Sequence, residues 1–208
     1  MNPTPPRRES TEDRRLAIAE AARDLIVEKG VEGLRTRDIA ERVGINIATL
    51  HYHVPTKEAL IHLVAQSLRD FFISQSQKPV RRGLPPLRRL ELEFDDFVEL
   101  LGERRALMAA MTELMERARR DEIVRAAVRP MMAGWRSSVC EILAAGLATG
   151  DFRPDLDPVP AAQMLVSAML GFSKSPEPTP ENFTRLRAEL LRAVRNPFRS
   201  APPKDQTA

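Results

Sequence analysis

The chain is poor in the residues that build disulfides and metal sites. Cys140 is the single cysteine among 208 residues, so no disulfide can form within the chain. There are three histidines, and two of them, His51 and His53, lie two positions apart. That spacing places two side chains about 200° apart around a helix, where they cannot hold one ion together. We therefore expect neither a metal nor another cofactor.

The chain also lacks the patterns typical of membrane proteins and enzymes. No apolar run approaches the roughly twenty residues that a membrane-spanning helix needs, and the start, Met-Asn-Pro-Thr-Pro-Pro-Arg-Arg, has no hydrophobic signal core. A glycine-rich phosphate loop, a nucleophile elbow and a series of Cys or His ligands are missing as well. We expect a cytoplasmic protein that is not an enzyme and has no membrane partner.

Charge of one sign is not in large excess. The formal net charge of +3 and the pI of about 9.4 permit a polyanionic partner such as nucleic acid without demanding one. Residues 1–57 contain ten Lys and Arg against nine Asp and Glu. A positive face in this region must therefore come from the placement of its basic residues.

Two short helical patterns are hinged at Gly44. In the first, Ile39, Ala40 and Val43 recur at the three- and four-residue spacing of a helix with one apolar face. Thr36 is expected to cap this helix through its hydroxyl. Gly44 follows the last apolar residue, at the place where a chain leaving a helix most easily takes positive φ. The pattern predicts a short helix and a tight turn.

The second pattern begins after Asn46, a good N-cap, and ends before Pro55, which has no amide hydrogen to donate. Leu50 is expected to face inward. The residues left on the outer side are Ile47, Ala48, His51 and Tyr52. A helix held at an angle by the one before it can enter the major groove of DNA. The two patterns together predict a helix-turn-helix.

The rest of the chain shows helical periodicity and no strand alternation. A supporting helix is expected over residues 11–29. Further helices are expected over about 57–74, 87–101, 105–119, 121–147, 158–172 and 180–194, with a loop over 77–86. Pro130 is expected to kink or split the helix over 121–147. The sequence therefore predicts an all-α chain of about nine helices.

The ordered series of residues around the hinge resembles the N-terminal domain of the tetracycline-repressor (TetR) family of bacterial transcription regulators. The matching residues are Ile18, Ala21, Ala22, Leu25, Gly30, Thr36, Ile39, Ala40, Val43, Gly44, Ile45, Thr49, Leu50, Tyr52, His53, Lys57, Glu58, Ala59 and Leu60. The segment from Gly146 to Pro158, with Asp157 as N-cap, is similar to the linker before the penultimate helix in the family. His51, Val54 and Asn46 depart from the usual Tyr, Phe and Ser, which leaves the base preference open.

The resemblance implies a division of the chain by function. Residues 11–56 would form the three-helix DNA-binding domain and residues 57–195 the helical effector-binding and dimerisation domain. The two ends, 1–10 and 196–208, are polar and contain prolines, so we expect disordered tails there. In the family the last two helices pair with those of a second subunit in a four-helix bundle. The interface residues expected here are Met164, Leu165, Ala168, Met169, Phe172, Phe183, Leu186 and Leu190.

The expected DNA contacts fall into two groups. Thr36, Tyr52 and Lys57 resemble the family's phosphate contacts, which set register without reading sequence. Ile47, Ala48 and His51 are better placed to meet base edges. The expected DNA-binding set is completed by Arg37, Asn46, Thr49 and His53. For each base-contact residue the competing interpretation is plain solvent exposure, and His53 has the alternative of packing beneath the second helix.

A cluster of pliable and aromatic residues is a candidate lining for an effector pocket. Its members are Phe94, Phe97, Met108, Met111, Met115, Met131 and Trp135. The competing interpretation is that they are ordinary core residues.

The sequence thus predicts a homodimeric transcription regulator, most simply a repressor, that binds a palindromic double-stranded operator and is released by a small apolar or amphipathic effector. One alternative is a DNA-binding regulator without a small-molecule effector, which is constitutive or controlled by a protein partner. Another is an enzyme with a DNA-binding appendage, which would need a catalytic constellation in residues 57–195, where none is visible. The effector, the operator and the sign of regulation stay open.

Overall fold

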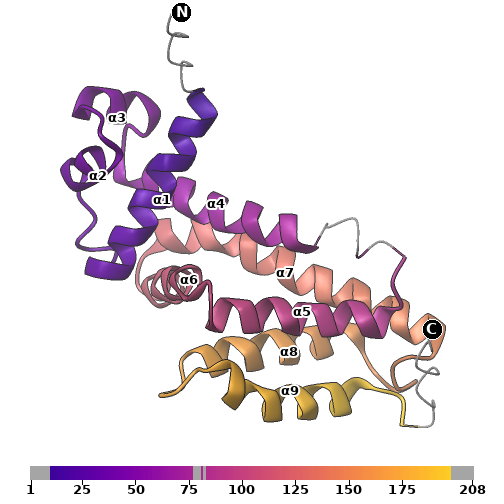
Figure 1. Cartoon of the computed structure of the whole chain (residues 1–208). Helices are drawn as coiled ribbons and strands as arrows, with labels where there is room; N and C mark the ends of the chain where they lie inside the picture. The colour runs from indigo at the N-terminus through magenta and orange to yellow at the C-terminus, as the bar shows by residue number, and fades with distance from the viewer. Residues whose placement is uncertain (1–9, 77–80, 82, 198–208) are drawn as a thin grey trace, which may run out of the picture. The chain divides into compact units, whose positions relative to one another are not determined.

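The computed structural model describes residues 10–76, 81 and 83–197, and in that part of the chain it is built from α-helices (Figure 1). The helices are α1 Thr11–Lys29, α2 Thr36–Val43, α3 Ile47–His53, α4 Lys57–Ser76, α5 Pro86–Leu101, α6 Arg105–Arg117, α7 Glu122–Thr149, α8 Pro158–Ser173 and α9 Pro180–Val194. The prediction of an all-α chain of about nine helices is confirmed for these residues. Most of the predicted tails and part of the predicted loop over 77–86 lie outside the described residues.

The chain divides into two compact units. Unit 1 comprises Met1–Ile73 and Ala106–Met131, and unit 2 comprises Ser74–Arg105 and Met132–Ala208. Unit 1 therefore contains α1, α2, α3 and nearly all of α6, while α4 and α7 contribute to both units. The predicted boundary between residues 56 and 57 divides the chain by function and stays a prediction.

Helix α1 is fixed at both ends by local chemistry. The Ser10 hydroxyl accepts a hydrogen bond from the Asp13 amide at 3.0 Å, and the Asp13 carboxylate accepts one from the Ser10 amide at 3.2 Å. This capping box satisfies two amides that the first helical turn leaves without partners. At the other end, Gly30 has a φ of 69° and donates its amide to Ile26 at 2.9 Å. The helix therefore ends where the sequence predicts.

Two contacts within unit 1 connect α6 with the segment that follows α1. Arg117 forms an ion pair with Glu32, and the Glu113 side chain lies close to Gly30. A β-carbon added at Gly30 would lie 3.1 Å from a Glu113 carboxylate oxygen. Residues more than eighty positions apart thus belong to one packed unit.

Helix α7 runs without a break through Pro130, so of the two predicted outcomes, a kink or a split, the split is wrong. A proline inside a helix removes the hydrogen bond to the carbonyl four residues earlier, here that of Ala126. Both Ala126 and Pro130 are exposed, so water can reach the freed carbonyl. An exposed site thus makes the proline tolerable.

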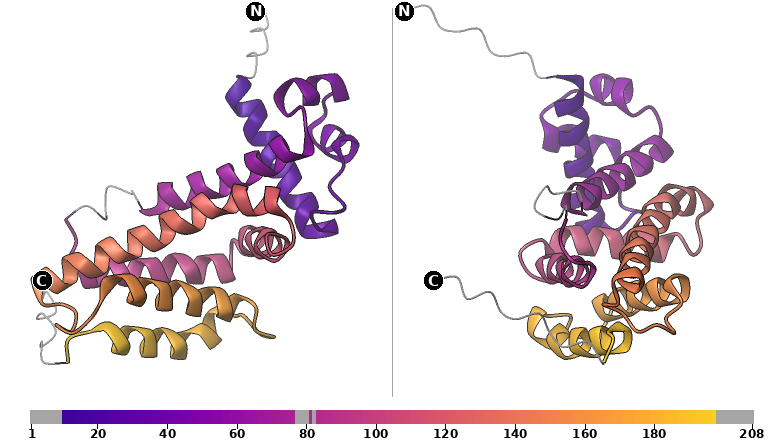
Figure 2. Two further views of the ribbon diagram at one scale, coloured as in Figure 1. Left: turned by 180° about the vertical axis from the view of Figure 1, so that it is seen from behind. Right: turned by 90° about the vertical axis from the view of Figure 1, so that its right-hand side faces the viewer.

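In unit 2, α8 and α9 run alongside each other (Figures 1 and 2), and α9 also packs against α5. The ring of Phe183 on α9 is central to their packing. Its centroid lies 4.8 Å from that of Phe97, 5.2 Å from that of Phe172 and 6.2 Å from that of Phe94. Aromatic rings at such distances stabilise a core beyond their buried area.

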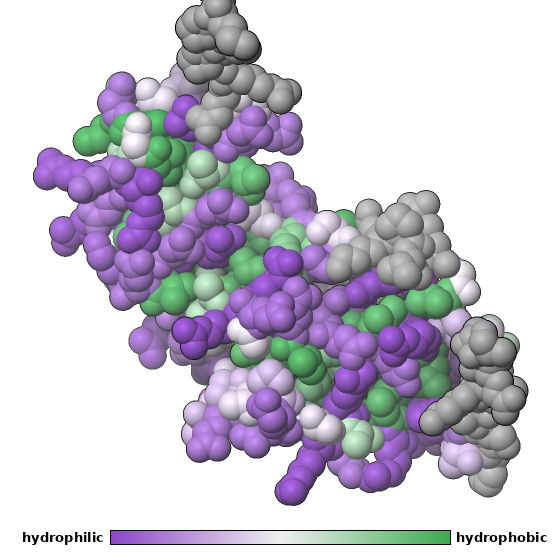
Figure 3. Space-filling view, viewed as in Figure 1, coloured by the Kyte–Doolittle hydropathy of each residue, from purple (hydrophilic) through white to green (hydrophobic). Residues whose placement is uncertain are grey.

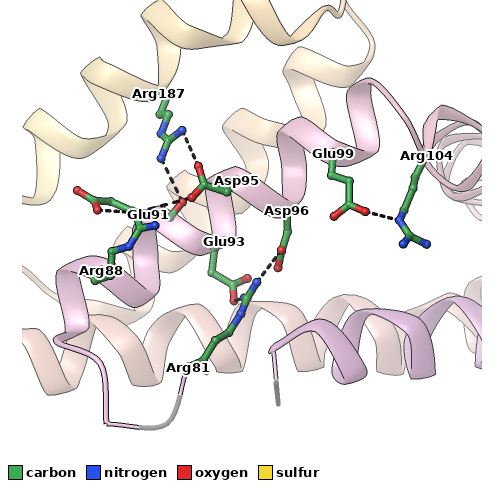
Figure 4. Close-up of polar contacts among 9 residues, drawn as sticks. All are labelled: Arg81, Arg88, Glu91, Glu93, Asp95, Asp96, Glu99, Arg104 and Arg187. Atoms are coloured by element: carbon green, nitrogen blue, oxygen red, sulfur yellow. Dashed lines mark hydrogen bonds and ion pairs between the residues drawn. The ribbon is translucent and has the colours of Figure 1, made fainter. Parts of the chain in front are cut away.

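Helix α5 carries a row of acidic residues that are paired with arginines (Figure 4). Arg81, 7% exposed, donates to Asp96 at 2.6 Å and lies 3.5 Å from Glu93, which is also buried. Burial raises the pKa of Glu93 and the charge of Asp96 raises it further, against the opposing effect of Arg81. On the far side of the helix, Arg187 of α9 pairs with Asp95 at 2.8 Å. These ion pairs fix α5 within unit 2.

Within the described residues, every helix is too short or too polar to cross a membrane. In the space-filling view of Figure 3, polar side chains divide the apolar surface into small areas.

Candidate nucleic-acid interface

Helix α2 is held against the C-terminal end of α1. Ile39 and Ala40 are buried, as the spacing predicts. Arg42 donates two hydrogen bonds to the Glu28 carboxylate, at 2.9 and 3.0 Å, and Lys29 donates to Asp38 at 2.7 Å. A bidentate arginine–carboxylate pair fixes orientation as well as distance. The two ion pairs therefore set the angle of α2 on α1.

These ion pairs make the stability of unit 1 depend on pH. The hydrogen bond from Arg42 lowers the pKa of Glu28 below its ordinary 4.5, and that from Lys29 lowers the pKa of Asp38 below its ordinary 3.8. A carboxyl with a lowered folded-state pKa contributes stability that is present above its ordinary pKa and is lost as the pH falls through the folded value. We expect the melting temperature of the wild type to fall as the pH is lowered from about 5 to about 3. The melting temperature of Glu28→Gln should fall less steeply, because this variant lacks one of the two carboxylates.

Thermal unfolding over this pH range checks the expectation. Glu20→Gln removes another carboxylate from an exposed position of α1 and serves as the control, since the Arg42 pair stays intact. If the melting temperatures of Glu28→Gln and the wild type changed equally with pH, the Arg42–Glu28 pair would not contribute to stability.

The prediction that Thr36 caps α2 is wrong. The N-cap position is taken by Arg35, which has an extended backbone at φ −120° and ψ 135° and makes no side-chain capping bond. Thr36 is the first helical residue, and a capping side chain must come from the extended residue before the helix. The Thr36 hydroxyl is therefore not used as a cap, and its role as a phosphate contact stays a prediction.

The turn after α2 has the geometry that the glycine predicts. Gly44 adopts the left-handed conformation at φ 72° and ψ 34° and donates its amide to Glu41 at 3.1 Å. The amide of Ile45 donates to Ala40 at 2.9 Å. Left-handed backbone costs little at glycine and more at any residue with a β-carbon. Gly44 thus redirects the chain within a few residues toward α3.

Helix α3 begins and ends as predicted. The Asn46 side chain accepts a hydrogen bond from the Thr49 amide at 2.7 Å, which confirms Asn46 as the N-cap. Leu50 is fully buried, and the chain leaves the helix at Val54, which is also buried, just before Pro55. This seven-residue helix is too short to be stable alone. Its caps and its buried leucine hold it in place.

The side of α3 opposite Leu50 is open to solvent. Tyr52 is 82% exposed and Ile47 is 42% exposed. The predicted DNA-contact residues that are exposed are Arg37, Asn46, Ile47, Ala48, His51, Tyr52 and Lys57; those that are half-buried are Thr36, Thr49 and His53. An isoleucine and a tyrosine left in water on one short helix are available to a partner.

His53 combines features of both alternatives that the sequence left open. Its ring is half-buried and meets the Tyr52 ring edge-to-face, with centroids 5.2 Å apart. Its backbone carbonyl accepts a hydrogen bond from Arg15 of α1 at 3.1 Å. The sequence gives no sign of this contact, since nothing in the local pattern pairs residues 38 positions apart.

The predicted pocket residues lie in two different units. Met108, Met111 and Met131 are buried and Met115 is half-buried in unit 1. In unit 2, Phe94 and Phe97 are buried against Phe183, as core residues are, and Trp135 is half-buried. The assignment of these residues to an effector pocket stays a prediction.

The predicted interface residues also differ in exposure. Leu165, Met169, Phe183 and Leu190 are buried within the subunit. Ala168, Phe172 and Leu186 are half-buried, and Met164 is exposed. The interface stays a prediction, and Met164 is the member best placed to meet another subunit.

A short helix capped by Asn46, set by the turn at Gly44 and open to solvent along its outer side defines the class of protein. The chain is a helix-turn-helix DNA-binding regulator.

Two family models match the chain. The one described as bacterial regulatory proteins, tetR family, matches residues 18–64, and the one described as BetI-type transcriptional repressor, C-terminal, matches residues 86–193. The second match alone covers more than half of the chain. The protein belongs to the TetR family of bacterial transcriptional regulators, as the sequence resemblance implied.

Relatives and solved structures agree with this assignment. The HTH-type transcriptional repressor KstR2 of Mycolicibacterium smegmatis is 26% identical over 147 residues, which are 69% of this chain and 70% of that protein. A TetR-family regulator from Rhodococcus sp. has a crystal structure with a TM-score of 0.76 and 25% identity, covering 88% of this chain and 96% of that one. AibR in complex with isovaleryl coenzyme A and operator DNA shares the fold, with a TM-score of 0.69 and 24% identity over 87% of this chain and 99% of that one.

Proposed function

We propose that this regulator is a homodimeric repressor that acts in the cytoplasm on a palindromic operator and is released by a small apolar or amphipathic molecule. The observation that carries the proposal is the solvent-exposed side of the capped helix α3, with Ile47 and Tyr52 exposed. Support for repression comes from KstR2, which is described as a transcriptional repressor. Support for an effector comes from AibR, whose structure contains both isovaleryl coenzyme A and operator DNA.

The proposed mechanism requires two copies of α3. In a dimer, the two recognition helices enter major grooves that are about one helical turn, roughly 34 Å, or somewhat more apart. An effector that binds better to a conformation with another spacing shifts the population away from the DNA-bound form. Its effect on DNA affinity is limited by its difference in affinity for the two conformations.

Selection of bound fragments from random double-stranded DNA tests the proposal most directly. We expect the purified protein to enrich a palindromic consensus, because a symmetric dimer reads the same half-site twice. A consensus would give the half-site, its spacing and the dimer symmetry together. Failure to enrich any sequence would contradict the proposal that the protein binds a specific operator.

The effector part of the proposal has its own test. A small molecule that raises the melting temperature of the protein should also release the selected operator, because ligand binding and DNA binding are linked. A screen in which no compound stabilised the protein or released DNA would leave a regulator without a small-molecule effector.

The proposed division of roles predicts different effects from two exposed residues. Lys57→Ala should weaken binding to every DNA about equally and lower the salt dependence by about one phosphate contact, because a phosphate contact carries no sequence information. Ile47→Ala should instead change the ranking of half-sites, because Ile47 is placed to meet a thymine methyl group. Fluorescence anisotropy with the consensus and single-base variants measures both effects.

Lys174→Ala is the control for the loss of one positive charge, since Lys174 follows α8 and is far in sequence from the DNA-reading helices. It should bind all DNAs as the wild type does. Equal losses on every DNA from Lys57→Ala and Ile47→Ala would contradict the division into phosphate and base contacts.

A further inference from the structure

The C-terminal end of α3 receives a hydrogen bond from outside the helix-turn-helix. Nη1 of Arg15, on α1, donates to the backbone carbonyl of His53 at 3.1 Å, and the contact is partly buried. Both residues belong to unit 1. Arg15 itself is half-buried, three residues before Ile18, which is fully buried. The donor is therefore placed by a packed helix.

The His53 carbonyl needs such a donor. The last four carbonyls of a helix have no partner within it. The Leu50 carbonyl is satisfied by the Val54 amide at 2.9 Å. The His53 carbonyl would need the amide of Lys57 if the helix continued, but the backbone leaves the helix at Val54, with φ −141° and ψ 86°. A guanidinium at this end also complements the negative end of the helix dipole.

The bond acts on the part of α3 that carries the proposed DNA contacts. His53 is the last residue of α3, and its ring packs edge-to-face on that of Tyr52, the exposed tyrosine. The N-terminal end of the helix is held by the Asn46 cap and its middle by the buried Leu50. Arg15 adds a third point of attachment, at the end near Tyr52 and His51.

We propose that Arg15 is a positioning residue for DNA recognition, which ties the last turn of α3 to α1 and so fixes the direction in which Tyr52 and His51 meet the operator. The inference rests on the proposed function, in which α3 is the recognition helix. Hydrogen bonds between a side chain and a base edge work within a few tenths of an ångström around 3 Å. A small rotation of α3 would therefore lose base contacts while phosphate attraction, which acts over a longer range, would remain.

The test compares Arg15→Met, which keeps the length and apolar stem of the side chain without its donors, with Arg15→Lys, which keeps the charge and one donor group. Arg14→Met is the control, because it removes the same charge one position along α1 and leaves the His53 bond in place. Affinities for the selected operator and for an unrelated duplex are measured at one salt concentration. We expect Arg15→Met to lose about tenfold in operator affinity and little on the unrelated duplex, Arg15→Lys to recover part of the loss, and Arg14→Met to keep the ratio of the two affinities.

Two results would overturn the proposal. One is an Arg15→Met protein that binds the operator as tightly as the wild type. The other is an equal loss on operator and unrelated DNA with a lower salt dependence, which is the behaviour of a direct phosphate contact.

Hydrogen exchange in the free protein provides a readout that needs no DNA. We expect amides in residues 47–54 to exchange faster in Arg15→Met than in Arg14→Met, while the buried part of α1 stays protected. If the wild type selects no operator, the proposed function fails, and this exchange experiment still decides whether Arg15 fixes α3. Unchanged exchange in residues 47–54 would show that it does not.

Discussion

Replacing Met164 by glutamate should leave the subunit folded and abolish the proposed dimer. Met164 is 43% exposed on α8, so a carboxylate there stays in water in the monomer. The exposed residues beside it include Gln163, Ser167 and Gly171, which are small or uncharged and let another helix approach closely. In a dimer through this face the carboxylate would lose its water without gaining a partner, which is strongly unfavourable.

The expected loss of operator binding is large. A monomer can occupy one half-site only, and the second half-site contributes through a high effective concentration that is then lost. We expect an affinity loss of at least about a hundredfold for the full operator. Light scattering after gel filtration measures the mass, and anisotropy measures the affinity of the same samples.

Ile123→Glu is the matched control, because Ile123 on α7 is also 43% exposed and the change in charge is the same. It should remain a dimer and bind the operator. A dimeric Met164→Glu protein would place the interface elsewhere. Leu165 and Met169 are poor probes of the interface because both are fully buried within the subunit, where a charge would unfold it.

Gly146→Ala should destabilise unit 2 strongly. A β-carbon at Gly146 would lie 2.1 Å from two ring atoms of Phe152, a distance that no side-chain packing tolerates. The ring is 1% exposed, and the neighbouring backbone is fixed, because the Asp151 amide donates to Gly146 at 2.8 Å and the Asn196 amide donates to Asp151 at 3.0 Å. Neither the ring nor the chain can move away easily.

Overpacking of a core costs about 1–3 kcal/mol and occasionally more, which for a chain of this size lowers the melting temperature by roughly 2–4 °C per kcal/mol. Gly134→Ala is the control on the same helix, since its β-carbon would meet nothing within 4 Å. That change should raise stability by about 0.5–1 kcal/mol, because alanine is the better helix former. Equal melting temperatures for the two variants would show that the Phe152 contact does not constrain Gly146.

Features set by a few neighbouring residues could be predicted from the sequence. Asn46 and Asp157 cap the helices that follow them, and Gly44 takes the left-handed conformation. In each case one residue supplies a side-chain acceptor or an unhindered backbone within three or four positions of its partner. The continuity of α7 through Pro130 could not be settled in this way, because it depends on which side of the helix faces water.

Features set by distant residues could not be predicted. The periodicity places Leu165 and Met164 on one apolar helix, yet only the packed subunit shows that the first is buried and the second exposed. The bond from Arg15 to His53 and the pairs that join α2 to α1 likewise depend on how helices meet. An arginine on an amphipathic helix gives no local sign of which carbonyl it will reach.

The composition of unit 1 has a consequence for the order of events during synthesis. Its helices come from two stretches of chain, and Glu32 meets Arg117 only after the intervening residues have been made. The last residue of unit 1, Met131, follows the end of α3 by roughly eighty residues, which a ribosome adds in about 4–16 s at about 5–20 residues per second. The DNA-reading helices therefore leave the ribosome seconds before the α6 and α7 segments that complete their unit.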